Sequence, residues 1–206
     1  LPPRHQLVYF NEITHWKYAQ HAYIQMYPRA DRNGDLPPHW SHEIYERRPD
    51  LALTKVYARQ PWYAWPRFYH RVFNDLMHYG VGDVTHSSGH QEHFNQWRLQ
   101  RLLGAPRQTP EEVTAEYCRT WFGPEAAPLM TEALFLLGHV MEEIPGTPSD
   151  RKESVERCYD LMKQAGELMP AWRRQQDYVW HMYMQKAAVD RYTQERVRQQ
   201  KTLQQR

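Results

Sequence analysis

The sequence is poor in several features that would assign a protein to a class at once. It has 2 cysteines, Cys118 and Cys158, in 206 residues, so one disulfide is the most that could form and no disulfide framework exists. Its 26 Lys and Arg nearly balance 24 Asp and Glu, which excludes the strong basic field of a protein built to hold nucleic acid. The best apolar stretch, Ala133–Val140, is far too short to span a bilayer. We therefore expect no nucleic-acid partner and no membrane segment.

Aromatic rings are what the sequence has in quantity. It contains 8 Trp, 14 Tyr and 6 Phe, together with 12 His. Hydrophobic residues make up 41% and charged residues 24%, a balance typical of a globular protein. Rings in this number can fill a core, and they also suit stacking on the flat face of a sugar or a base. Because the chain opens on Leu1 rather than Met, we expect it to be part of a longer polypeptide.

The first half of the chain alternates short β-forming runs with helical patterns. Strands are predicted at Leu7–Phe10, Leu53–Tyr57 and Val81–Thr85, and Pro66 suits the first turn of a helix between the last two. Strands that alternate with helices usually pair in parallel through crossover connections. Three strands cannot close a barrel, so residues 1–104 are predicted to be the C-terminal part of an α/β, TIM-like barrel.

The second half is predicted to be helical throughout. Thr109-Pro110-Glu111-Glu112 is a capping box with proline at the first helical position, a specific signal for a helix start. Residues 105–206 are therefore predicted to form a helical domain. The fold class that follows is predominantly helical, with the last strands of a (β/α)8-type barrel leading into a helical array. Three tryptophans on apolar helical faces are assigned to the core: Trp97, Trp121 and Trp172.

Two stretches resemble a known family. One is Tyr69–Leu103, YHRVFNDLMHYGVGDVTHSSGHQEHFNQWRLQRLL, and the other is Thr109–Met130, TPEEVTAEYCRTWFGPEAAPLM. Together they resemble the closing part of bacterial glycoside hydrolases with an α-glucuronidase-like TIM barrel, a group that includes some endo-β-N-acetylglucosaminidases. Where that group usually has a tryptophan after two leucines, this chain has Gly104. The resemblance implies a hydrolase fold and a carbohydrate ligand.

Asn11 and Glu12 are the first candidate site residues, because they follow the first predicted strand. Barrel enzymes place catalytic groups at the carboxyl ends of strands, and glycoside hydrolysis needs two carboxyl groups beside the scissile bond. Glu12 is predicted to be catalytic, with Asn11 holding sugar hydroxyls. The alternative is that Glu12 caps a helix that begins near Thr14.

A polar loop after the last predicted strand supplies the second group of candidates. Asp83 and Glu92 are candidates for the second catalytic carboxyl, and His86 and His90 for substrate binding. A plain structural loop is the close alternative. A third interpretation is a zinc site made by His86, His90 and His93, but their spacing matches no standard zinc signature and a Ser-Ser-Gly turn interrupts them.

Trp62, Tyr63 and Trp65 lie between two prolines and are predicted to form a stacking platform for sugar rings. The alternative is that these rings pack beneath the loop, as large aromatic side chains often do.

Three functions stay open on the sequence alone. The favoured one is a segment of a glycoside hydrolase that acts on a complex glycan. The alternatives are a non-catalytic carbohydrate-binding or scaffold segment and a metal-dependent hydrolase. The expected partners are a carbohydrate ligand and the remainder of a larger polypeptide, with no cofactor and no bound metal. A periplasmic or extracellular bacterial location is favoured.

Overall fold

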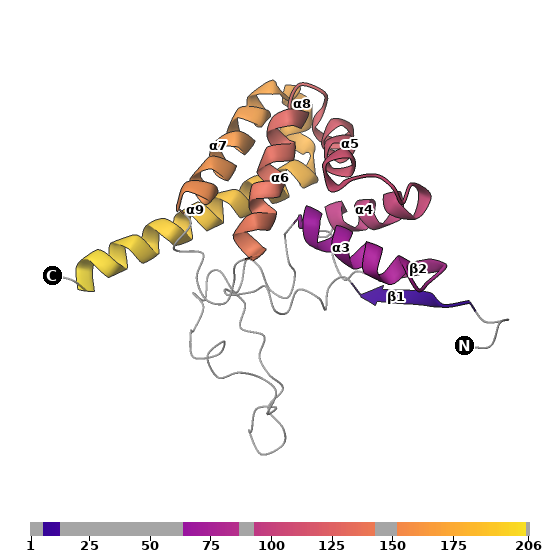
Figure 1. Ribbon diagram of the computed structural model, residues 1–206. Helices are drawn as coiled ribbons and strands as arrows, with labels where there is room; N and C mark the ends of the chain where they lie inside the picture. Colours follow the sequence, from indigo (N-terminus) through magenta and orange to yellow (C-terminus); the bar gives the residue numbers. More distant parts are fainter. Residues whose placement is uncertain (1–5, 13–63, 87–92, 143–151, 205–206) are drawn as a thin grey trace, which may run out of the picture.

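The computed structural model describes residues 6–12, 64–86, 93–142 and 152–204 (Figure 1). In these ranges helices outnumber the two short strands, and none of the helices is long and apolar enough to cross a membrane. In chain order the elements are β1 (Val8–Glu12), α3 (Pro66–Met77), β2 (Gly82–His86), α4 (His93–Gly104), α5 (Pro110–Phe122), α6 (Ala127–Glu142), α7 (Lys152–Leu168), α8 (Ala171–Gln176) and α9 (Tyr178–Gln204).

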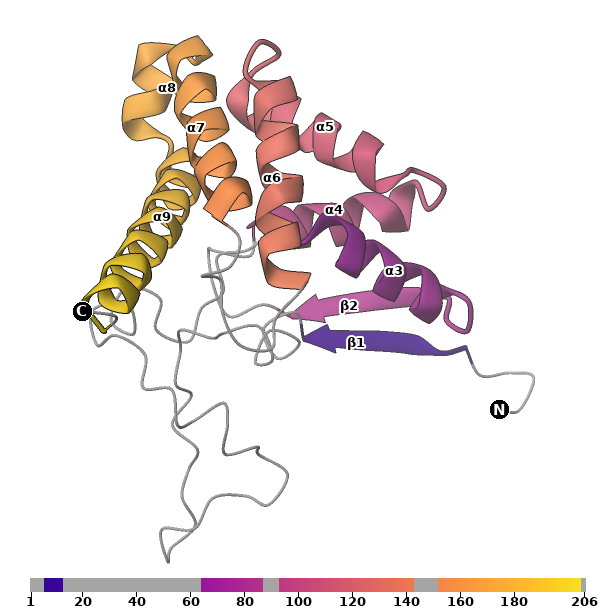
Figure 2. The same cartoon turned by 60° about the vertical axis from the view of Figure 1, so that its left-hand side comes forward.

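The two strands pair in parallel. Their register matches Val8 with Gly82 and runs to Glu12 opposite His86. Gly80 makes room for this pairing, because a Cβ atom there would lie 2.5 Å from the ring of Tyr9. Figure 2 shows the strand pair at one end of the molecule with α3 and α4 lying on one side of it. The predicted strands near residues 7–10 and 81–85 are therefore present, and Leu53–Tyr57 lies outside the described residues.

The prediction that the first 104 residues are a (β/α)8 barrel remnant is wrong. Within the described ranges the sheet has two strands only, and the chain continues from β2 into helices that pack on one another. Strand and helix alternation is a local signal, and it does not report how many strands share a sheet. The prediction of a helical array after Gly104 is confirmed for the described residues.

A single hydrophobic core connects the helices on both sides of residue 104. Tyr69 and Phe73 of α3 and Leu99 and Leu102 of α4 belong to the same buried cluster as side chains of α5, α6, α7 and α9. Among its fully enclosed members are three large side chains from α5 and α9, Tyr117, Phe122 and Tyr183. The core thus crosses the boundary that the sequence predicted between two domains.

The start of α5 follows the sequence signal. The Thr109 hydroxyl accepts a hydrogen bond from the Glu112 backbone N–H, and the Glu112 carboxylate accepts one from the Thr109 N–H. Pro110 occupies the first helical position, where a missing N–H costs no hydrogen bond. The predicted capping box is confirmed.

Asp177 separates α8 from α9, although the spacing of apolar residues predicts one continuous helix from Trp172 to about Val197. The Asp177 carboxylate accepts hydrogen bonds from the backbone N–H groups of Val179 and Trp180, so it starts α9 and ends α8. Trp172, in α8, is 61% exposed, which makes its assignment to the core wrong. The sequence of a short helix with a single aromatic residue does not indicate which of its faces is buried. Trp97 and Trp121 do pack against the core.

The contact between α7 and α9 has two unusual features. Gly166 lets α9 approach closely, because a Cβ atom at that position would lie 2.5 Å from the indole ring of Trp180. Lys186 and Asp190 form an ion pair in which both side chains are almost fully buried.

Both cysteines are buried free thiols, and burial raises the pKa of each to about 12.

Candidate functional site

The carboxyl ends of β1 and β2 bring together predicted site residues that are far apart in the sequence. Asn11 is in register with Thr85, and Glu12 is in register with His86. Neighbouring strands lie about 4.8 Å apart, so these backbone positions are adjacent at one edge of the strand pair. Sequence reasoning treated Glu12 and His86 as members of one site, and the pairing puts their backbones side by side.

Asp83 lies elsewhere. It is inside β2 rather than in the loop after it, and its register partner is Tyr9. Three residue steps along the strand, roughly 10 Å, separate it from His86 at the strand end. Asp83 is therefore set back from the edge that carries Glu12. Glu92, the other predicted acidic partner, lies outside the described residues, as does His90.

Of the predicted stacking platform, Trp65 is described, and Trp62 and Tyr63 lie outside the described residues. Trp65 is 8% exposed, and its indole stacks on the Phe68 ring with centroids 4.0 Å apart. The Trp65 backbone is held from α4, since its N–H donates to the Asn95 side chain and its carbonyl accepts from Arg98. This residue occupies a core position at the start of α3.

A second group of rings gathers where α4, α5 and α9 meet, and we call it the ring cluster: His93, Trp97, Tyr117, Trp121 and Tyr178. The His93 ring lies edge-on to Trp121, with centroids 4.4 Å apart, and to Tyr178, with centroids 6.0 Å apart. Its Nδ1 lies 2.8 Å from the Tyr117 hydroxyl. Tyr117 is fully buried, whereas Tyr178 is 52% exposed, so the cluster extends from the core to the surface.

The ring cluster favours neutral groups. Burial lowers the pKa of His93, an effect that Asp177 partly offsets. Burial raises the pKa of Tyr117 well above its ordinary value, and the neighbouring Tyr183 adds to this. The hydrogen bond between His93 and Tyr117 therefore joins a neutral imidazole and a neutral phenol. The surrounding rings have apolar faces that suit the C–H groups of a sugar.

Sequence reasoning missed the ring cluster, although a signal was there. His93 and Trp97 are four residues apart, and so are Tyr117 and Trp121, which places each pair on one helical face. Assigning Trp97 and Trp121 to the core is correct but incomplete, because the same helical faces also carry His93 and Tyr117. That the two faces meet depends on how α4 and α5 pack.

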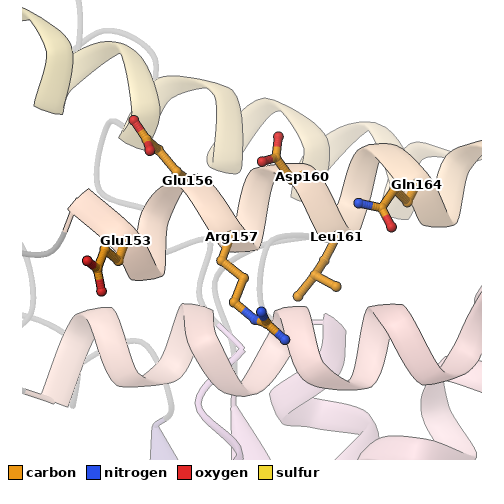
Figure 3. A pocket seen from close by; sticks show the side chains of 6 residues that line it. All are labelled: Glu153, Glu156, Arg157, Asp160, Leu161 and Gln164. Carbon is orange, nitrogen blue, oxygen red and sulfur yellow. The ribbon is translucent and has the colours of Figure 1, made fainter.

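An open groove of about 630 Å³ runs along α7 on another part of the surface (Figure 3). In Figure 3 Glu156 and Asp160 point toward α9, while Arg157 points toward α6, where it forms an ion pair with Glu132. The remaining lining residues are Glu153, Leu161 and Gln164. The groove is acidic and lies on a helix that carries none of the predicted site residues.

Among the described residues no three His, Cys, Asp or Glu side chains gather in a way that could hold a metal ion. Only His93 of the three histidines in the zinc hypothesis has a described side chain, and its Nδ1 is hydrogen-bonded to Tyr117. That these histidines bind no zinc stays a prediction.

No protein-family model, curated protein or solved structure matches this chain. The family resemblance noted in the sequence therefore stays a hypothesis.

Proposed function

We propose that this chain is part of a carbohydrate-processing hydrolase in which Glu12 acts at the carboxyl edge of the β1–β2 pair. The observation that supports this proposal is the parallel register, which puts the backbones of Glu12 and His86 side by side. Asn11 precedes Glu12 and is opposite Thr85 at the same edge. Four residues with polar side chains thus share one short strand edge.

Of the groups that glycoside hydrolysis needs, this edge carries one carboxyl, that of Glu12. One carboxyl protonates the leaving oxygen, and a second carboxylate or the substrate's own acetamido group stabilises the oxocarbenium-like centre. Glu12 is the proposed proton donor, His86 and Asn11 hold sugar hydroxyls, and Glu92 is the proposed second carboxyl. Asp83 is set back by three residues from the strand end, so Glu92 is the better partner.

The ring cluster favours a second candidate function, binding of a glycan without cleavage. Tyr178 brings an exposed ring to the surface beside His93, whose ring also lies against Trp121, as a sugar-stacking surface requires. In this case the chain contributes affinity, and hydrolysis is carried out by another part of the polypeptide.

The test replaces Glu12 with glutamine in the complete polypeptide and measures release of nitrophenol from a panel of 4-nitrophenyl glycosides, including the N-acetylglucosaminide. Glutamine preserves shape and removes the acidic proton. We expect kcat on the hydrolysed glycoside to fall at least about a hundredfold, while binding of the uncleaved glycan persists.

The matched control is Glu167→Gln, an exposed glutamate on α7 far along the chain from the strand edge. This variant should keep wild-type turnover. Undiminished hydrolysis in Glu12→Gln would remove Glu12 from the mechanism. Binding of a glycan by the wild-type protein with no turnover of any glycoside would favour the second function instead.

A further inference from the structure

The Arg98 side chain is the most unusual charged group in the described part of the molecule. It belongs to α4 and is fully buried. Its Nη1 donates one long hydrogen bond, 3.4 Å, to the Trp65 carbonyl oxygen. Its Nε and Nη2 are buried and have no hydrogen-bond acceptor among the residues the structure describes. A guanidinium presents five N–H donors, so most of its hydrogen-bonding capacity is unused.

His70, on α3, adds a third nitrogen to this group. Its Nδ1 is buried and has no partner in the described ranges, although the residue as a whole is only partly enclosed. Burial lowers the pKa of His70, and the positive charge of Arg98 lowers it further. The Trp65 carbonyl oxygen that Arg98 contacts also accepts a hydrogen bond from the backbone N–H of Tyr69, the residue before His70, so the guanidinium lies against the turn of α3 that leads to His70.

No carboxylate of the described residues neutralises this charge. The Glu111 carboxylate acts on Arg98 from a distance, but it is exposed and already bonded to Arg67, with Nη2 and Oε1 3.1 Å apart. Burial lowers the pKa of Arg98 to about 9, so the guanidinium still carries its charge at neutral pH. A buried charge without a counter-ion is strongly unfavourable, so this arrangement calls for an anion.

We propose that Arg98 and His70 bind a small anion of the carboxylate or phosphate class between α3 and α4. The guanidinium fork matches two oxygen atoms of such a group, and the imidazole Nδ1–H donates to a third position. Arg98 is fully enclosed and His70 is partly exposed, so the anion approaches from the side of His70. This site involves neither Glu12 nor the ring cluster and does not depend on the proposed hydrolase activity.

Anion binding here is coupled to the segment that enters α3. Arg98 also holds the Trp65 carbonyl, and Asn95, one turn earlier on α4, accepts from the Trp65 N–H. An anion that fixes the guanidinium therefore also stabilises the chain entry into α3. The occupied site should raise the melting temperature of the whole protein, because the α3 residues Tyr69 and Phe73 belong to the main core.

The experiment measures the melting temperature of the full chain with sodium phosphate or sodium acetate as probes, at constant ionic strength against sodium chloride. We expect at least one of the two probes to raise the wild-type Tm by about 3 °C or more at saturation. A response to phosphate alone assigns the site to phosphate-bearing ligands, and a response to acetate alone assigns it to carboxylates. Arg98→Met should abolish the rise, and the unliganded variant should melt no lower than the unliganded wild type.

Two further variants serve as a control for charge and as a second test of the anion site. Arg71→Met removes an exposed positive charge next to His70 and should retain the wild-type response. If Arg98→Met does not fold, His70→Gln is measured by calorimetric titration of the same probe, with an expected loss of affinity on the order of tenfold. A wild-type Tm that neither probe raises, or a rise that persists in Arg98→Met, would overturn the proposal.

Discussion

At the scale of the residue, His93 shows how packing changes what a side chain can do. In the sequence it closes a polar loop and is a candidate zinc ligand. In the structure it is the first residue of α4, and its partly buried ring contacts the rings of Tyr117, Trp121 and Tyr178. Burial lowers its pKa, so the folded protein holds it as a neutral imidazole.

This burial predicts a pH dependence of stability. In the unfolded chain His93 takes up a proton as the pH falls through its ordinary pKa of 6.5, while in the folded protein it stays neutral to lower pH. The unfolded state then binds more protons, so the free energy of unfolding decreases as the pH is lowered from about 7.5 to about 5.5. His93→Gln removes this contribution and should flatten the decrease, as measured by urea unfolding at several pH values.

The control is His78→Gln, which changes an exposed histidine at the end of α3 and should leave the slope as in the wild type. His70 also has a lowered pKa, so the His93 variant should keep part of the slope. Equal slopes for the wild type and His93→Gln would contradict the assignment of a neutral, partly buried His93.

At the scale of the element, helix boundaries are set by a few polar side chains. Thr109 and Glu112 start α5, and Asp177 separates α8 from α9 by accepting two backbone N–H groups. The first signal is complete within four consecutive residues, so it could be recognised in the sequence. The second is a single aspartate inside a helical pattern, and aspartate is tolerated in helices often enough that it marks no boundary alone.

Thr109→Ala tests the capping box. It removes the hydroxyl that accepts from the Glu112 N–H, and we expect a loss of about 1 kcal/mol in the free energy of unfolding. Chemical denaturation would measure it. The matched control is Thr120→Ala on the same helix, where the hydroxyl donates to the Glu116 carbonyl of its own helix and its loss should be nearly neutral. Equal losses in the two variants would contradict a specific capping role.

At the scale of the whole molecule, one core connects α3 and α4 with the later helices. The α9 helix packs along α7, where Gly166 accommodates the Trp180 ring and the buried Lys186–Asp190 pair lies within the helix packing. Burial lowers the pKa of Lys186 and raises that of Asp190, and their mutual attraction opposes both shifts. Each of the two side chains therefore keeps its charge in the core because the other supplies the opposite charge.

Lys186→Met should therefore destabilise the protein by about 3–5 kcal/mol, because it leaves the Asp190 carboxylate buried without its counter-charge. The double variant Lys186→Met, Asp190→Leu replaces both charges with apolar groups and should recover most or all of that loss. Urea denaturation of the wild type, both single variants and the double variant completes the cycle. Additive losses in the double variant would show that the two side chains are not coupled.

Much of the helical part could be predicted from the sequence because its signals are local. The capping box, the proline at the start of α3 and the 3.6-residue spacing of apolar side chains each act within a few residues. The short β-forming runs that became β1 and β2 were recognisable for the same reason. The candidate residues Asn11, Glu12 and His86 were found because they follow those runs.

The tertiary structure decided everything that depends on contacts between distant segments. The sequence does not determine how many strands share a sheet, so two strands followed by helices had the same local pattern as the end of a barrel. That Trp172 is exposed, that His93 enters the ring cluster and that Arg98 is buried against the Trp65 carbonyl all depend on which helix faces pack together. Packing is a property of whole helices, and no window of neighbouring residues contains it.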